Sequence, residues 1–152
     1  MTAHIDHVTA VVGDTEAATH ALACVTGAGP CAEVNSARMS VRTFLAGPVA
    51  IELTTSTSQG PVRDFYDAHG PIFHHVAFRV DDLDERMTAL AARGLPTLGA
   101  PIDTAPGVRE VFLDPKHTGG LMIQLVERRS EGHQPLDPEA IERLAGSTAS
   151  ST

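Results

Sequence analysis

The chain repeats one pattern twice along its length. His7 begins the stretch HVTAVVGD, and His75 begins the stretch HVAFRVDD. In both copies an Ala- and Leu-rich segment follows and ends at a glycine, Gly27 or Gly94. A repeated unit of this kind predicts two similar modules that pack against each other, because one copy alone leaves its apolar face uncovered.

Each copy is expected to form a βαβββ unit. Runs of β-branched and apolar residues indicate the strands, and Asp14 can cap the helix that follows the first of them. The expected strands are 5–12, about 31–34, 39–45 and 49–54 in the first module, and 73–80, about 96–98, 108–113 and 121–126 in the second. The expected helices are 15–25, 62–68 and 83–93. The sequence therefore predicts an α+β fold built from two tandem βαβββ modules.

Composition shifts along the chain set the expected boundaries. The two modules are expected at about 4–56 and 72–128, and the linker between them at 57–71. Residues 1–129 are then expected to form one domain, which is an ordinary size for a single core. Residues 130–152 are polar and end in GSTASST, which predicts a C-terminal tail with a short helix at 138–145.

Composition also narrows the class of protein. With 152 residues, 42% hydrophobic residues and a net charge of −8, the chain is typical of a soluble protein, and the charge argues against a nucleic-acid partner. It has no apolar run of about 18 residues and no basic start followed by an apolar stretch, so we expect neither a membrane partner nor a signal peptide. Cys24 and Cys31 lack metal-site spacing and suit a reduced, cytoplasmic setting.

Four polar residues interrupt otherwise apolar strands: His7, Glu52, His75 and Gln124. A buried polar side chain without a partner is costly, so each of them needs a reason to be there. Two imidazoles, a carboxylate and an amide oxygen suit a divalent ion such as Zn, Co, Mn, Ni or Fe(II), with zinc preferred. The pattern predicts a four-ligand metal site where the modules meet. The alternative is that these positions face solvent on half-exposed strands.

Several longer motifs resemble a known family. They are IDHV (5–8), AIELTTS (50–56), GPVRDFYDAHGPIFHHVAFRVDDL (60–83) and VFLDPKHTGGLMIQLVE (111–127). Over about residues 4–128 the chain resembles the vicinal oxygen chelate (glyoxalase/bleomycin resistance/dioxygenase) superfamily, and within it the methylmalonyl-CoA epimerase-like branch. The resemblance implies a cupped mixed sheet around a divalent metal held by the four polar residues, a homodimer, and enolate-type chemistry on a small molecule.

Two positions depart from that branch. The resemblance leads us to expect a Glu at Arg42 and a metal-bound Glu at Gln124. An amide cannot act as a base, and Arg is always protonated, so neither residue can replace the expected acid. Position by position, the chain should not be a methylmalonyl-CoA epimerase.

The repeat offers another pair of acids. Aligning the modules puts Arg42 opposite Glu110 and Glu52 opposite Gln124, so the acids lie in the opposite halves from those the resemblance implies. We therefore expect Glu52, on the metal, and Glu110, across the cleft, to be the catalytic acid/base pair. The alternative is that Glu110 is a solvated strand residue paired with Arg109 or Arg42.

The expected function is a metal-dependent epimerase or isomerase that exchanges a proton on the carbon next to a carbonyl. The expected substrate is a keto-polyol, such as a cyclitol ketone of secondary metabolism, with Arg42 and Lys116 as substrate contacts and His74 on the opposite face of its strand. The alternatives are an acyl-CoA epimerase of the methylmalonyl-CoA type, a metal-free antibiotic-binding protein, and an Fe(II) dioxygenase.

Overall fold

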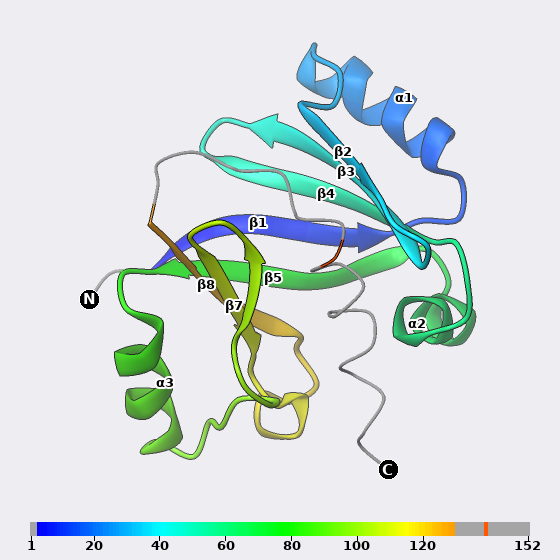
Figure 1. Ribbon diagram of the computed structural model, residues 1–152. Coiled ribbons are helices and arrows are strands. Elements are labelled where there is room, and N and C mark those ends of the chain that lie inside the picture. Colours follow the sequence, from blue (N-terminus) through cyan, green and yellow to red (C-terminus); the bar gives the residue numbers. More distant parts are fainter. Residues whose placement is uncertain (1–2, 130–138, 140–152) are drawn as a thin grey trace.

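Two antiparallel strands, β1 (His4–Val11) and β5 (Ile72–Val80), join the halves of one eight-stranded sheet. The computed structural model describes residues 3–129 and residue 139, and the sheet has the order β2-β3-β4-β1-β5-β8-β7-β6 (Figure 1). The sheet is mixed, since β1 pairs with β4 and β5 pairs with β8 in parallel, whereas the other pairs are antiparallel. It curls into a half-barrel, so the expected α+β fold with a cupped sheet is confirmed.

The two halves of the sheet follow the same order of elements. The first half continues with α1 (Thr15–Thr26), β2 (Ala32–Asn35), β3 (Met39–Ala46) and β4 (Val49–Ser56). The helix α2 (Pro61–His69) connects it to the second half. The second half continues with α3 (Leu83–Ala91), β6 (Ile102–Ala105), β7 (Val108–Phe112), the 3₁₀ turn η1 (Pro115–His117) and β8 (Ile123–Arg128).

The same capping chemistry starts α1 and α3. The Asp14 carboxylate accepts a hydrogen bond from the Ala17 amide at 2.9 Å, and the Asp82 carboxylate accepts one from the Glu85 amide at 2.8 Å. Each cap satisfies a backbone N–H that the first helical turn leaves without a partner. The repeated Asp therefore turns the chain from β1 and from β5 into a helix in the same way.

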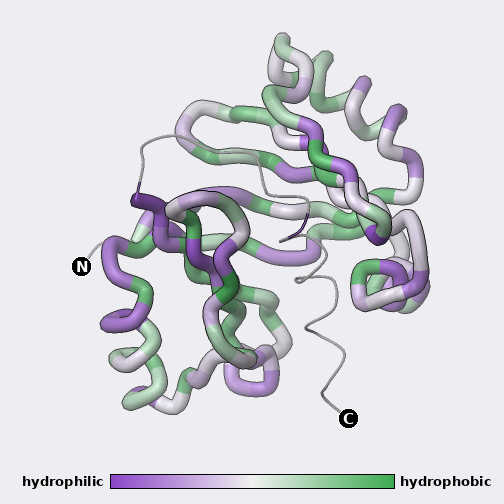
Figure 2. The backbone as a smooth tube through the Cα atoms, in the orientation of Figure 1, coloured by the Kyte–Doolittle hydropathy of each residue, from purple (hydrophilic) through white to green (hydrophobic). Residues whose placement is uncertain are grey.

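Packing places the helices on different faces of the sheet. Leu83 of α3 is fully buried with Val80, Val111, Leu113 and Leu125. Along the strands and helices, hydrophobic and hydrophilic positions are interspersed (Figure 2), as expected for elements with one buried face. The helix α2 instead packs Val62 toward a cluster of Val34, Met39 and Val41 in the first half.

One expected strand differs from the structure, and one expected helix lies almost entirely outside the described residues. The weak strand expected at 96–98 is wrong: Thr97 forms only an isolated bridge with Leu113, and β6 lies later, at Ile102–Ala105. The helix expected at 138–145 lies outside the described residues apart from Glu139. Within the described part of the chain, no helix is long and apolar enough to cross a membrane.

Candidate metal and proton-transfer site

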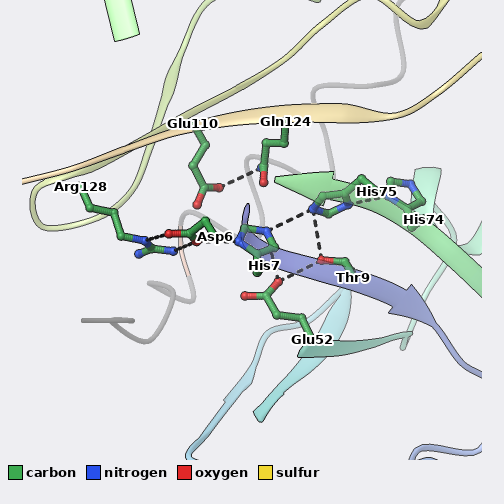
Figure 3. A network of polar contacts seen from close by, with 9 residues as sticks. All are labelled: Asp6, His7, Thr9, Glu52, His74, His75, Glu110, Gln124 and Arg128. Atoms are coloured by element: carbon green, nitrogen blue, oxygen red, sulfur yellow. Dashed lines mark hydrogen bonds and ion pairs between the residues drawn. The ribbon is translucent and has the colours of Figure 1, made fainter. Parts of the chain in front are cut away.

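Two histidine side chains face each other across the central pair of strands. His7 on β1 and His75 on β5 place their Nε2 atoms 3.3 Å apart, with the rings nearly perpendicular (Figure 3). His7 is 3% exposed. The repeat puts the two residues at matching positions of antiparallel strands, so they meet where the halves join.

Glu52 brings a carboxylate from β4 to the same point. The Thr9 hydroxyl donates a hydrogen bond to Glu52 Oε2 at 3.2 Å, and this oxygen lies 3.8 Å from His7 Nε2. Thr9 Oγ1 is also 3.1 Å from His75 Nε2. Thr9 and Glu52 are buried. Thr9 therefore ties the carboxylate of the first half to the imidazole of the second.

Gln124 and Glu110 form the corresponding part of the second half. Gln124 on β8 donates its amide N–H to Glu110 Oε2 on β7 at 3.1 Å. The side-chain oxygen of Gln124, Oε1, and the second carboxylate oxygen of Glu110, also Oε1, are both buried. Neither has a hydrogen-bond partner in the described part of the chain. Burial raises the pKa of Glu110. A protonatable carboxyl group and an unpaired amide oxygen thus lie opposite Glu52.

A β-bulge in each central strand supports the two histidines. The register between β1 and β5 shifts at Asp6 and again at His74, the residue before each site histidine. Asp6 Oδ1 accepts a hydrogen bond from His7 Nδ1 at 2.9 Å, and His74 Nδ1 lies 2.8 Å from His75 Nδ1. The expectation that His74 points to the opposite face is wrong, because a bulge interrupts the alternation of side chains.

A buried ion pair fixes Asp6 and, through it, His7. Arg128 donates two hydrogen bonds to the Asp6 carboxylate, both at 2.8 Å. Burial would raise the pKa of Asp6, but Arg128 and His7 outweigh burial and hold it well below its usual range. Burial likewise lowers the pKa of His7 most strongly, yet the charges of Glu52 and Asp6 prevail and raise it to about 9. The site is therefore a strongly negative environment that favours a cation.

The two histidines of the second half have lowered pKa values instead. Burial lowers the pKa of His75 well below its usual value, and burial lowers the pKa of His74 to about 4. The ring of His74 packs against Phe65 of α2 at 4.5 Å between centroids, and the ring of His75 packs against Phe112 at 5.1 Å. Both imidazoles thus keep a lone pair at neutral pH.

The donor set fits a divalent metal, although the side chains have not converged on one point. Among residues 3–129 and 139, no three His, Cys, Asp or Glu side chains form a finished metal cluster. The Nε2 separation of 3.3 Å nevertheless matches two ligands that each lie about 2.0 Å from one tetrahedral ion. Gln124 Oε1 is buried and lacks a partner among the described residues, which fits an oxygen ligand. His7, His75, Glu52 and Gln124 thus line one cavity, and their role as metal ligands stays a prediction.

A cavity of about 560 Å³ opens from these polar groups. The polar side chains at one end of it are Glu52, Glu110, Gln124, His7, His74 and His75. Its other walls are mainly apolar and include Val11, Met39, Val41, Phe65, Phe112 and Met122. Helix α2 contributes Phe65 and covers one side. The cavity can hold a small molecule with one polar and one apolar end.

Arg42 does not line this cavity, so the expectation that it contacts a substrate there is wrong. Its guanidinium binds Glu33 and Thr19 at 3.0 Å and Glu16 at 2.7 Å, on the side of the sheet covered by α1. Side chains alternate along a strand, and the neighbouring Val41 faces the cavity.

The strand register explains this error. Thr43 pairs with Glu52, and Phe112 pairs with Gln124, so Phe112 corresponds to Thr43. Counting two residues back, Glu110 corresponds to Val41, not to Arg42. The sequence alignment was wrong by one residue, and a one-residue slip moves a side chain to the other face of the sheet.

Lys116 also lies away from the cavity. It is exposed in the turn η1, and it is not one of the residues that line the cavity walls. Arg38, next to β3, is a cationic residue that does line the walls. Neither of the two substrate contacts expected from the sequence therefore lines the cavity, whereas Arg38 and His74 do.

Sequence reasoning missed Asp6, Thr9 and Arg128, which shape the site, and placed a fourth such residue, His74, on the wrong face of its strand. A signal existed for two of them, because an acid or a second His directly precedes each site histidine. Thr9 and Arg128 carry no such signal. Only the folded sheet brings Arg128 to Asp6, which is 122 residues away in sequence.

Comparisons with known proteins identify relatives. A sequence model of the Glyoxalase/Bleomycin resistance protein/Dioxygenase superfamily matches residues 6–112. The uncharacterized protein YqjC of Bacillus subtilis (strain 168) is 30% identical over 102 residues, which cover 66% of this chain and 73% of that protein.

Two solved structures share the fold. The hypothetical protein BH1468 from Bacillus halodurans C-125 has a TM-score of 0.79 and 19% identity, covering 88% of this chain and 100% of its own. A methylmalonyl-CoA epimerase from Mycobacterium tuberculosis has a TM-score of 0.75 and 24% identity, covering 84% of this chain and 89% of its own.

Proposed function

The chain belongs to the glyoxalase/bleomycin resistance protein/dioxygenase superfamily, and from that premise we propose that it is a metal-dependent isomerase. The reaction is the exchange of a proton on the carbon next to a carbonyl, which inverts that carbon. The observation that carries the proposal is the pair of buried carboxylates, Glu52 and Glu110, that reach one cavity from opposite halves of the sheet. Proton transfer to both faces of one carbon requires two such groups.

Four residues would hold the metal: His7 and His75 through Nε2, Glu52 through its carboxylate and Gln124 through Oε1. When bound, a divalent ion polarises a carbonyl oxygen and makes the neighbouring C–H more acidic. Asp6 keeps Nδ1 of His7 occupied, so the lone pair of Nε2 is directed toward the site once the proton on Nε2 is displaced. The negative environment that raises the pKa of His7 also favours a cation in place of that proton.

Glu110 and Glu52 carry the proton in this proposal. Burial raises the pKa of Glu110, which makes this carboxyl a stronger base and favours its protonated form. Gln124 holds Oε2 of Glu110, which leaves Oε1 without a partner among the described residues. In the first half, Thr9 donates a hydrogen bond to Glu52 Oε2. One carboxylate removes the proton from one face of the carbon, and the other returns a proton to the opposite face.

The cavity walls bear on the substrate. The sequence suggested a keto-polyol, whose hydroxyl groups need many polar partners. Beyond its polar end, however, the cavity is lined mainly by apolar side chains such as Val41, Phe65 and Met122. This observation favours a second candidate, an acyl thioester that carries an alkyl group on the exchanging carbon. A methylmalonyl-CoA epimerase shares the fold.

Proton exchange tests the proposal. The zinc-loaded protein is incubated in D₂O with α-hydroxy ketones, including cyclitol ketones, and with acyl-CoAs, and deuterium is followed by NMR. We expect deuterium on the carbon next to the carbonyl in one of the two classes, and we expect chelation of the metal to stop its uptake. If no substrate of either class takes up deuterium, the proposal is wrong.

Metal analysis of the purified protein separates the remaining alternatives. Stoichiometric zinc, cobalt or manganese supports the isomerase. Oxygen-sensitive iron would instead indicate a dioxygenase, and a protein that binds no divalent ion would indicate a metal-free binding protein. The homodimer expected from the family resemblance stays a prediction, which the mass of the protein in solution can test.

A further inference from the structure

Asp6 and His74 occupy corresponding positions in the two halves but offer different atoms. Each lies at the β-bulge directly before a site histidine, and each contacts Nδ1 of that histidine. Asp6 is clamped by Arg128 and does not line the cavity. Among the described residues, no charged side chain clamps His74 in this way. Its ring carries a second nitrogen, Nε2, which an aspartate lacks.

The contact between the two rings of the second half determines where their protons lie. Nδ1 of His74 and Nδ1 of His75 are 2.8 Å apart, so one nitrogen must donate and the other must accept. When a metal is bound between the facing histidines, His75 Nε2, which lies 3.3 Å from His7 Nε2, must present its lone pair to that ion. His75 then carries its proton on Nδ1 and donates it to His74. His74 is therefore left with its proton on Nε2.

His74 lies at the cavity wall, where two aromatic rings surround its imidazole. His74 lines the cavity wall between Phe65 of α2 and Phe112 of β7, at 4.5 and 6.5 Å between ring centroids. The hydrogen bond to His75 uses Nδ1, so Nε2 is the nitrogen of His74 that remains for a ligand in the cavity. Two aromatic rings hold the imidazole in place but accept no strong hydrogen bond from it.

We propose that His74 is a substrate-binding residue that donates a hydrogen bond from Nε2 to a second oxygen of the substrate, away from the oxygen at the His7–His75 pair. The inference rests on the proposed function for the identity of that ligand. It adds a residue that determines specificity, because the ligand would have one oxygen held between the facing histidines and a second oxygen that reaches past His75 to His74. A ligand with a single oxygen leaves the His74 donor unused.

The first arm of the test reads the protons directly. Histidine labelled with ¹⁵N is observed by NMR in the full-length protein, with and without zinc. In the zinc-loaded protein we expect His74 to carry its proton on Nε2 and His75 to carry its proton on Nδ1. The opposite assignment, with His74 donating from Nδ1, would overturn the proposal. This arm needs no substrate, so its outcome does not depend on whether the protein exchanges protons.

The second arm uses two substitutions that each keep one nitrogen position of the ring. In His74→Asn the amide oxygen can replace Nδ1 as the acceptor for His75, but nothing replaces Nε2. In His74→Gln the amide nitrogen can replace Nε2, but the acceptor for His75 is lost. His117→Asn, in the exposed turn η1, is the matched control. Calorimetry measures the dissociation constants of zinc and of oxalate, malonate and succinate bound to the zinc form.

The two variants should change different constants. His74→Asn should bind zinc like the unaltered protein but bind the best dicarboxylate about 3- to 10-fold more weakly. His74→Gln should bind zinc about 10-fold more weakly, because His75 loses its supporting partner, and should keep more of the dicarboxylate affinity once zinc is saturating. Equal dicarboxylate affinity in His74→Asn and the unaltered protein overturns the proposal. So does a zinc form that binds none of the three dicarboxylates.

Discussion

The two halves of the sheet hold their site histidines with different chemistry. In the first half, a charged pair of Asp6 and Arg128 supports His7, and the pKa of His7 is raised to about 9. In the second half, the neutral ring of His74 supports His75, whose pKa is lowered by burial. The backbone frame is shared, down to a bulge in each strand. The difference teaches that one half attracts a cation, whereas the other supplies neutral hydrogen-bonding groups.

The acids are divided between the halves in the same unequal way. The first half places its acid, Glu52, on the last strand, where the second half has Gln124. The second half places its acid, Glu110, on β7, where the first half has Val41. Each half therefore gives one carboxylate, and neither half alone has the pair that inversion of a carbon requires.

Glu52→Gln makes the last strands of the two halves alike and should have the largest effect. It removes an acid/base group and a charged ligand, so proton exchange should fall by about 10²- to 10⁴-fold. The rate of deuterium uptake and the zinc dissociation constant measure this loss. Glu33→Gln, exposed on β2, is the control and should retain activity. Unchanged exchange in Glu52→Gln would show that the halves need not differ at this position.

Arg128→Met removes the cation that distinguishes the first half. Its side chain is 1% exposed and paired with Asp6, and removing one partner of a buried pair costs about 3–5 kcal/mol. Urea denaturation should show that decrease in the free energy of unfolding. Arg109→Met, which breaks a surface pair with Asp84, is the control and should cost far less. Equal losses in the two variants would mean that the buried pair has no special role.

Arg42→Gln and Lys116→Gln should have the smallest effect. Neither residue lines the cavity, so the KM of the substrate should stay within about twofold of its original value, as for most surface changes. Val41→Phe, at the neighbouring position that does line the cavity, should raise KM because the larger ring fills the space for substrate. A large rise of KM in Arg42→Gln would contradict the strand register that places Val41 opposite Glu110.

Much of the site could be predicted, because a polar residue buried in an apolar strand costs free energy unless it is hydrogen-bonded, paired or bound to a metal. The repeat identified His7 and His75, and the ends of the last strands identified Glu52 and Gln124. Side-chain alternation is strict enough that these four, once assigned to strands, had to share one face.

The errors arise where the alternation or the alignment is interrupted. His74 was assigned to the wrong face because a β-bulge cannot be read from residue spacing. Arg42 was assigned to the cavity because the modules were aligned one residue out of register. The strand at 96–98 was misplaced because a short edge strand leaves little pattern in the sequence, and Thr97 forms only one bridge. Long-range partners such as Arg128 depend on the folded sheet.

Glu110→Gln followed in D₂O with one pure epimer at a time is the most direct measurement of the division of labour between the halves. If Glu52 and Glu110 serve opposite faces of the carbon, inversion should fall by about 10²- to 10⁴-fold, while one epimer, and only one, should still take up deuterium with retention. Inversion at the rate of the unaltered protein would show that Glu110 carries no proton, and the two-acid mechanism would be wrong.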